Sequence, residues 1–229
     1  MSTLATPETT VSPLGGHAQF YLRRLHSLTG LVFGGYIVVH LLVNATLMQG
    51  THPDVYQAQV DKIHSLPFLV AIEWVFIFLP ILFHTFYGIW ITVIGQPNVN
   101  NYPFAKNFFY LSQRVSAIMI AAFIAFHVLA MKGVFGSGLA FDPARATAST
   151  VAHITASPTL VYFVYPLGVL ASCVHLANGV WTAAITWGLT VSAAAQRRWG
   201  GVCIALFVLT LVCGVLALVA VNGAGGAGR

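Results

Sequence analysis

The residues of this sequence best suited to chemistry are histidines inside long apolar stretches. The pattern H-x-x-x-G-x-W occurs twice, at residues 84–90 and 175–181. On a helix, residues four apart share a face, so Gly88 and Gly179 each lie one turn from the histidine of their own copy. A histidine beside a position without a side chain suits a large flat group such as a porphyrin.

Two further histidines, His40 and His127, lie deep in two other apolar stretches. Taken singly, a membrane histidine is explained about as well by a hydrogen bond to a neighbouring helix as by metal ligation. Four of them on four helices, two in a repeated motif, favour ligation. Four such histidines make two axial pairs, which predicts two haems b with iron ligands His40, His84, His127 and His175.

The composition is that of a membrane protein. Of the 229 residues, 58% are hydrophobic and 7% are charged, and the mean hydropathy is +0.82. Five apolar stretches reach the roughly 20 residues that a membrane-spanning helix needs; they cover about 27–48, 67–95, 112–132, 158–189 and 200–221. Their continuous hydrophobicity argues against a membrane β-barrel. We therefore expect an all-α membrane protein with five transmembrane helices, four of which form a haem-binding bundle.

We expect one membrane domain over residues 21–222, between flexible tails at 1–20 and 223–229. No apolar stretch precedes position 27, so no cleavable signal peptide is predicted. The three cysteines lack metal-ligand spacing and are expected to pack in the core. There is no nucleotide-binding motif, and the pI of about 9.3 does not indicate nucleic acid.

The charges cluster at the expected helix ends and predict the orientation in the membrane. If the N-terminus is cytoplasmic, six basic residues face inside: Arg23, Arg24, Lys106, Arg114, Arg197 and Arg198. The positive-inside rule then places the chain in the cell membrane with the N-terminus in the cytoplasm and the C-terminus outside.

This orientation fixes the depth of each histidine. With a rise of about 1.5 Å per residue, His40 lies ~15 Å and His127 ~9 Å below the outer face. By the same rise, His84 and His175 each lie ~25 Å below it. The histidines therefore form an outer pair and an inner pair, a two-step electron path. Each imidazole is expected to donate its other N–H to a carbonyl or hydroxyl oxygen.

Polar residues near the inner helix ends are candidates for contacts with the haem propionates. Arg24, His26, Ser27 and Arg114 could supply charge and hydrogen bonds there, although membrane topology explains the arginines equally well. The other histidines fall in the tail or in loops, where solvated or interfacial positions are expected; they are His17, His52, His64 and His153.

Several ordered motifs resemble one family over about residues 20–221. They are Arg23-Arg24-Leu25-His26-Ser27-Leu28, Ser65-Leu66-Pro67-Phe68, Phe78-Leu79-Pro80, Gln113-Arg114-Val115 and His175-x-x-Asn178-Gly179-x-Trp181. The chain resembles the single-polypeptide dihaem cytochrome b subunit of succinate:menaquinone oxidoreductases, the membrane anchor of bacterial succinate dehydrogenase. More distantly, it is similar to the dihaem anchor of fumarate reductases.

The resemblance implies two haems b, a bound menaquinone, and partner flavoprotein and iron–sulfur subunits in a complex that could form higher oligomers. It implies the same axial pairs. Asn178, within the matching motif, is expected to contact the cofactor together with Gly88 and Gly179 of the repeated pattern. By itself the chain is expected to have no dehydrogenase activity. Glu73, the one acidic residue inside an apolar stretch, is a candidate for quinone binding or proton transfer, or an interfacial residue that reaches the lipid headgroups.

Three alternatives stay open on the sequence. The first is the anchor of a fumarate reductase, which runs in the opposite direction. The second is a transporter or structural bundle without haem, whose histidines relay protons or pack. The third is a haem-bearing anchor for another dehydrogenase.

Overall fold

The computed structural model describes residues 15–50, 54–96 and 99–226. These residues form helices and connecting segments, without strands. Five helices are long and apolar enough to cross a membrane, and they cover Gly16–Gln49, Leu69–Ile94, Ala105–Met131, Leu160–Thr186 and Ala193–Ala224. The predicted all-α membrane fold with five spanning helices is confirmed, and the protein is a multi-pass membrane protein.

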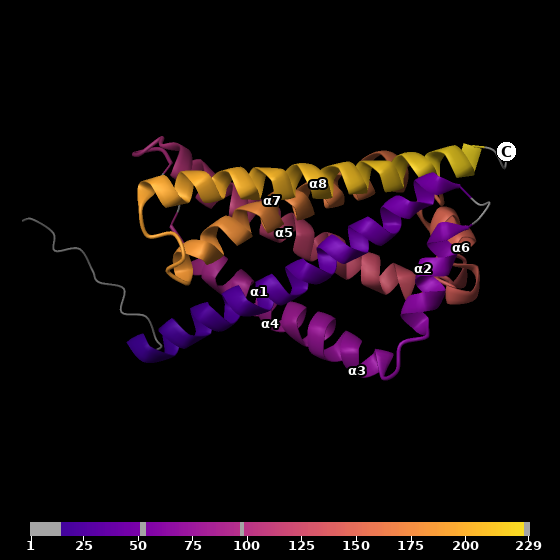
Figure 1. Ribbon diagram of the computed structural model, residues 1–229, viewed down its shortest axis with the longest axis horizontal. Coiled ribbons are helices and arrows are strands. Elements are labelled where there is room, and N and C mark those ends of the chain that lie inside the picture. Colours follow the sequence, from indigo (N-terminus) through magenta and orange to yellow (C-terminus); the bar gives the residue numbers. More distant parts are fainter. Residues whose placement is uncertain (1–14, 51–53, 97–98, 227–229) are drawn as a thin grey trace, which may run out of the picture.

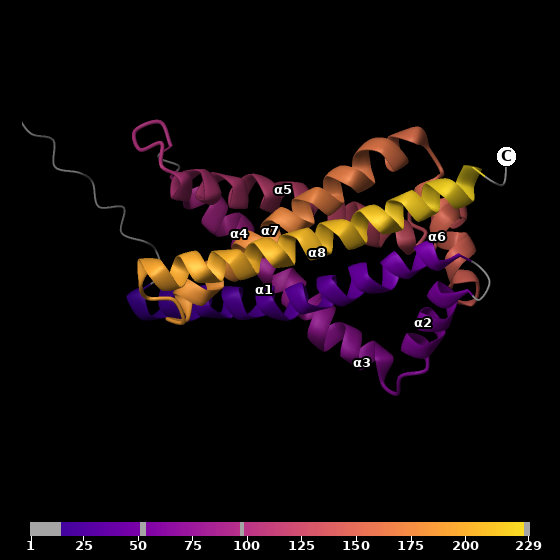
Figure 2. The ribbon, with the colours of Figure 1, turned by 45° about the horizontal axis from the view of Figure 1, so that its top comes forward.

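The first span consists of α1 (Gly16–Ala45) and a 3-10 turn (Thr46–Gln49), and the third is α5 (Ala105–Met131). The fifth span belongs to α8, which covers Ala193–Gly226. These helices run the length of the molecule in Figures 1 and 2. Along it, α8 packs against both α1 and α7, which places the histidine-free helix beside the other spans.

The second and fourth spans share a local irregularity. α3 (Leu69–Glu73) leads through a π-helical turn (Trp74–Phe78) into α4 (Leu79–Ile94), and a π-helical turn (Leu160–Val164) leads into α7 (Tyr165–Thr186). In both, a proline stands in the first turn after the π segment. Proline lacks the N–H that the α-helical ladder requires, and its ring crowds the carbonyl one turn earlier. A widened turn relieves both problems without interrupting the span.

One end of the bundle, here named the cap end, is covered by the short helices α2 (Val55–His64) and α6 (Ala146–Ile154), seen together in Figure 1. Gln57 joins the two, because its amide oxygen accepts from the backbone N–H of Ala146 at 2.7 Å. Its amide nitrogen donates to the Pro143 carbonyl, also at 2.7 Å. Tyr56, Val60 and Ala146 form a buried cluster beneath them.

The opposite end, here named the basic end, contains the N-terminal ends of α1, α5 and α8, so that Arg23, Arg24, Lys106, Arg197 and Arg198 all lie there. Lys106 on α5 donates to the Gln196 amide oxygen on α8 at 3.2 Å. Trp187, just after α7, donates its indole N–H to the Ser27 hydroxyl on α1 at 3.1 Å. The six residues of the predicted inner face all lie within the first ten residues of α1, α5 or α8.

The helix boundaries differ from the predicted apolar stretches mainly at the basic end. α1 begins at Gly16, within the tail predicted for 1–20, and α8 continues to Gly226, within the tail predicted for 223–229. Residues 1–14 and 227–229 lie outside the described residues. α5 and α8 also start about seven residues before their apolar stretches. Hydropathy marks the part of a helix in hydrocarbon, whereas the helix itself continues through the interface with polar side chains.

Candidate functional site

The four predicted ligand histidines meet in two pairs across the bundle. His40 on α1 faces His127 on α5, with ring centres 6.1 Å apart and ring planes at 73°. His84 on α4 faces His175 on α7, with ring centres also 6.1 Å apart and planes at 89°. We name them the cap-end pair and the basic-end pair. They correspond to the outer and inner pairs predicted from helix depth.

The spacing in each pair fits one metal ion held between two imidazoles. An imidazole nitrogen binds a transition metal at about 2 Å. Bonds of about 1.33 Å place that nitrogen roughly 1.1 Å from the centre of its five-membered ring. An ion midway between two rings would therefore separate their centres by roughly 6 Å. Both pairs match this separation, as bis-histidine ligation of two haem irons requires.

In the basic-end pair, backbone carbonyls hold the second ring nitrogen of each histidine. Nδ1 of His84 donates to the His26 carbonyl at 2.9 Å. Nδ1 of His175 donates to the Gln113 carbonyl at 3.2 Å. A carbonyl only accepts, so each Nδ1 carries the proton and each Nε2 keeps the lone pair that binds a metal. The Gln113 amide nitrogen lies 3.3 Å from Nε2 of His175, so a metal bound there would displace this amide.

In the cap-end pair, tyrosine hydroxyls take the place of the carbonyls. The Tyr36 hydroxyl lies 3.4 Å from Nδ1 of His40, one turn away on the same helix. The Tyr165 hydroxyl lies 3.0 Å from Nδ1 of His127. All four histidines thus have Nδ1 beside an oxygen that can accept its proton. This is the arrangement that orients metal-binding histidines and fixes their tautomer.

The two pairs are related by an internal repeat. Position 26, whose carbonyl holds His84, precedes His40 on α1 by 14 residues, and position 113, whose carbonyl holds His175, precedes His127 on α5 by the same number. At about 1.5 Å per residue, the two levels lie roughly 20 Å apart along these helices. α1 with α4, and α5 with α7, thus share one arrangement of carbonyl, histidine and H-x-x-x-G-x-W motif.

Glycines make room for side chains at the basic-end pair, although not in the way that the motif suggested. A Cβ added at Gly30 of α1 would lie 2.5 Å from Cε1 of His84, so the glycine in contact with the His84 ring is on the neighbouring helix. The space beside Gly88 is filled by the His26 ring, at 3.1 Å from a Cβ built there. At Gly179, the nearest atom to such a Cβ is Nε2 of Gln113, at 3.4 Å.

The residues predicted near the propionates lie at two places. Arg24 stacks on the rings of Phe20 and Trp187, and Trp187 also bonds Ser27, so Arg24 and Ser27 meet at the same indole. Arg114 lies inside α5, where it donates to the Ile91 carbonyl at 3.2 Å and packs over the Tyr110 ring. Asn178 donates to the carbonyl of residue 109 at 2.8 Å.

His26 lies against the basic-end pair rather than at a helix end. Its ring stacks on His84 with centres 4.0 Å apart and planes 10° from parallel. Its Nδ1 is buried without a hydrogen-bond partner. Among the described residues, four other side-chain atoms are buried without a partner: Tyr87 Oη, Gln113 Oε1, Arg114 Nε and Thr190 Oγ1. Buried polar atoms are normally satisfied. Of these atoms, Tyr87 Oη and Arg114 Nε can donate, and His26 Nδ1 can donate when it carries the proton, so they fit a group with acceptor substituents, such as the haem propionates; Gln113 Oε1 can only accept.

The prediction for His153 is wrong. It was expected to be solvated or interfacial, but its side chain is fully buried on α6, with 0% exposure. Nδ1 donates to the Leu139 carbonyl at 3.0 Å, and Nε2 lies within hydrogen-bonding distance of the Tyr165 hydroxyl. Burial lowers the pKa of this imidazole, which favours its neutral form. His17 and His64 are exposed as expected, and His52 lies outside the described residues.

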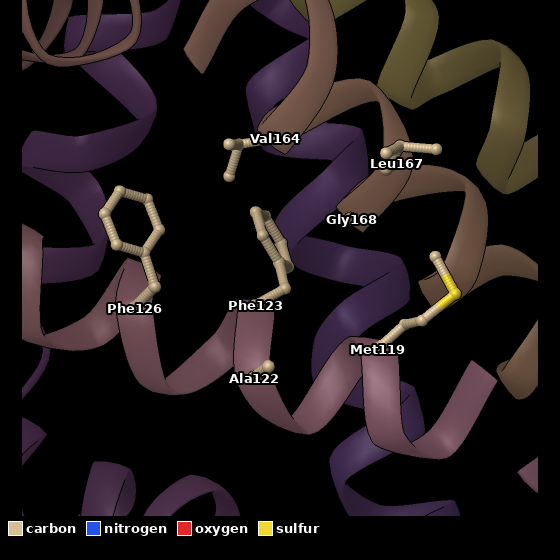
Figure 3. A pocket seen from close by; sticks show the side chains of 7 residues that line it. All are labelled: Met119, Ala122, Phe123, Phe126, Val164, Leu167 and Gly168. Atoms are coloured by element: carbon tan, nitrogen blue, oxygen red, sulfur yellow. The ribbon is translucent and has the colours of Figure 1, made fainter. Parts of the chain in front are cut away.

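Aromatic packing fixes the orientation of His127. Phe123, one turn earlier on α5, lies nearly parallel to the His127 ring and meets the Tyr165 ring edge-on. Gly168 of α7 admits the Phe123 ring, because a Cβ at this position would lie 2.4 Å from it. Figure 3 shows Phe123 pointing from α5 toward α7 at an apolar groove of about 300 Å³, which is lined by Met119, Ala122, Phe123, Phe126, Val164, Leu167 and Gly168.

Sequence reasoning did not find the partners Tyr36 and Tyr165. Tyr36 carried a detectable signal, since it stands four residues before His40 and so shares its helix face. Tyr165 carried none, because its contact with His127 depends on how α7 packs against α5. The three cysteines are buried and free, in agreement with the expected packing role.

No known family profile matches the chain. The chain is 33% identical over 210 residues to the succinate dehydrogenase cytochrome b558 subunit of Bacillus subtilis (strain 168), an alignment that covers 90% of this chain and 99% of that protein. It belongs to the succinate dehydrogenase cytochrome b family. Its predicted family is thereby confirmed, and the multi-pass fold is that of a membrane anchor. As a member of this cytochrome b family, the chain is the membrane subunit of an oxidoreductase.

Proposed function

We propose that this cytochrome b subunit binds two haems b, one at each histidine pair. One observation carries the proposal: two histidine pairs have the same 6.1 Å separation of ring centres, and every Nδ1 lies beside an oxygen. When bound, haem b supplies reversible one-electron chemistry at potentials that the axial ligands and their hydrogen bonds adjust.

The chain's own residues would hold the haem and keep water from it. The paired imidazoles of four spans supply the iron ligands, and carbonyl or hydroxyl oxygens orient those imidazoles. Near the basic-end pair, His26, Tyr87 and Arg114 would supply buried donors that lack partners in the protein. We propose Arg24 and Ser27, at Trp187, as further propionate contacts at the same end.

The two levels would form an electron path across the membrane, from the basic end to the cap end. The relative is named as a subunit of succinate dehydrogenase, so we propose that this chain anchors a flavoprotein and an iron–sulfur subunit. Arg23, Lys106, Arg197 and Arg198 are exposed at the basic end, and the one ion pair in the described part of the chain, Arg145–Asp142, is at the other end. Such a surface suits the docking of an acidic partner from the cytoplasm.

We propose that electrons leave the cap end to reduce menaquinone. Glu73 is partly buried at the last position of α3, next to the π-helical turn. The π-helical turn that follows it packs against α1, the helix that carries Tyr36 and the cap-end ligand His40. An acidic residue within a membrane span costs free energy, so a functional role is the default expectation. A carboxyl group at this position could deliver a proton to a quinone.

The direct test compares the isolated chain with the assembled complex. In the complex, succinate should reduce the b-type haems, and menaquinone should reoxidise them. The isolated subunit should show haem bands after chemical reduction but no reduction by succinate. The absence of haem bands from both preparations would overturn the proposal and favour a bundle without haem.

A further inference from the structure

A chain of hydrogen bonds leads from the cap end to the iron ligand His127. It starts at the Leu139 carbonyl, passes through His153 on α6 and the hydroxyl of Tyr165 on α7, and ends at Nδ1 of His127. His153 is fully buried, and Tyr165 is 5% exposed. Both ring nitrogens of His153 are therefore occupied by defined partners, away from water.

The chemistry of these groups fixes the direction of every bond. The Leu139 carbonyl can only accept, so Nδ1 of His153 carries the proton, and Nε2 of this neutral ring must accept. The one hydroxyl proton of Tyr165 therefore goes to His153. The Tyr165 oxygen is left to accept from Nδ1 of His127, which keeps the lone pair on Nε2, the nitrogen that would bind the metal.

We propose that His153 sets the tautomer of His127, and so positions this ligand for the cap-end haem. The inference rests on the proposed function, since it requires His127 to be an iron ligand. His153 is a positioning residue: it acts through Tyr165 and does not itself bind the haem.

The comparison with the basic-end pair shows why such a residue is needed here. There, His84 and His175 each have a backbone carbonyl, which can only accept, at Nδ1; the Ser116 hydroxyl also lies 3.3 Å from Nδ1 of His175, but it can donate to the same Gln113 carbonyl. A tyrosine hydroxyl can donate as well as accept. Without His153, the Tyr165 proton could turn to Nδ1 of His127 and move the imidazole proton to Nε2, where it would block iron binding. Beside His127, His153 is the group that takes this proton.

The cap end holds His153 in place for this role. α6 is fastened to α2 by the Thr147 hydroxyl, which donates to the Asp54 carboxylate at 2.9 Å, and by Thr150 and Tyr56, whose hydroxyls are 3.2 Å apart. Thr150 is 2% exposed. The short helices at the cap end therefore do more than cover the bundle, because they fix the acceptor that orients Tyr165.

Three variants of the assembled complex test the proposal. For each variant, three quantities are measured: the amount of haem b per polypeptide, the low-spin ferric electron paramagnetic resonance signal of each haem, and the midpoint potential of each haem. His153→Leu removes the acceptor and should weaken retention of the cap-end haem roughly ten- to a hundred-fold. The signal and potential of the basic-end haem should not change, which shows that the bundle has folded. His153→Gln should retain the cap-end haem, since its amide can donate to Leu139 and accept from Tyr165.

The double variant His153→Leu, Tyr165→Phe separates tautomer control from packing. Removing the hydroxyl removes the competing donor, so the double variant should hold the cap-end haem better than His153→Leu alone. A purely structural role predicts the opposite, because a second cavity adds to the first. The proposal is overturned if the double variant is worse than the single one, or if His153→Leu leaves the cap-end signal and potential unchanged. Failure of the proposed function would look different: His127→Ala would then retain both haems.

Discussion

Gly30 offers a test of the basic-end pair that leaves every proposed ligand in place. In Gly30→Ala, the new methyl group would lie 2.5 Å from Cε1 and 2.8 Å from Nδ1 of His84. Ordinary van der Waals contact begins at 3.4 Å, so the ring must withdraw by about 1 Å. α1 cannot move away easily, because the His26 carbonyl on the same helix holds Nδ1 of His84 at 2.9 Å.

A shift of this size is large compared with the tolerance of the site. An iron–imidazole bond of about 2 Å cannot absorb a displacement of roughly half its length. Weakening the hydrogen bond that orients a ligand costs roughly ten- to a hundred-fold in metal affinity by itself. We therefore expect Gly30→Ala to lose the basic-end haem and to keep the cap-end haem, whose ligand His40 lies about 15 Å further along α1.

Gly35→Ala is the matched control. Gly35 lies on the same helix, is exposed, and has open space where a Cβ would be added. Both variants gain the same helix propensity, about 1 kcal/mol, so this effect cancels in the comparison. Haem b per polypeptide should fall from two to one in Gly30→Ala and stay at two in Gly35→Ala. Two haems with an unchanged basic-end spectrum in Gly30→Ala would refute this account of how His84 is positioned.

Three further predictions follow from the proposed electron path. Glu73→Gln in the assembled complex should leave succinate-driven haem reduction intact and lower menaquinone reduction sharply; unchanged turnover with menaquinone would remove Glu73 from the mechanism. Arg197→Gln with Arg198→Gln should weaken binding of the iron–sulfur subunit, measured by co-purification at rising salt, whereas full retention would place docking elsewhere. Reporters fused to the two termini should report the N-terminus in the cytoplasm and the C-terminus outside, and the reverse result would invert the assignment of both histidine levels.

Much of the fold could be predicted from the sequence because hydropathy and histidine depth are one-dimensional signals. Five apolar stretches gave five spans, and counting residues from the helix ends paired His40 with His127 and His84 with His175. The internal repeat was visible as the two H-x-x-x-G-x-W motifs. These features survive helix tilt and bending, because they depend on the order of residues along each helix.

The surroundings of each histidine could not be predicted, because they depend on helix rotation and on contacts between segments distant in sequence. Gly88 was expected beside the cofactor, but the His26 ring occupies the space next to it. The glycine that lies against the His84 ring is Gly30 of α1. His153 was assigned to a loop because it falls between two apolar stretches, but its ring packs against Phe126 of α5 and Tyr165 of α7 and is buried there. Hydrophobic periodicity along the sequence does not indicate that this imidazole is fully buried and bonded at both nitrogens.

The central claim is that each histidine pair holds one haem, and difference spectroscopy of four alanine variants tests it most directly. The purified wild-type complex should contain two haems b per copy of this chain. His84→Ala and His175→Ala should each remove the same haem, and His40→Ala and His127→Ala should each remove the other. If His40→Ala left both haem spectra intact, or if His40→Ala and His84→Ala removed the same haem, the assignment of two separate bis-histidine sites would be contradicted.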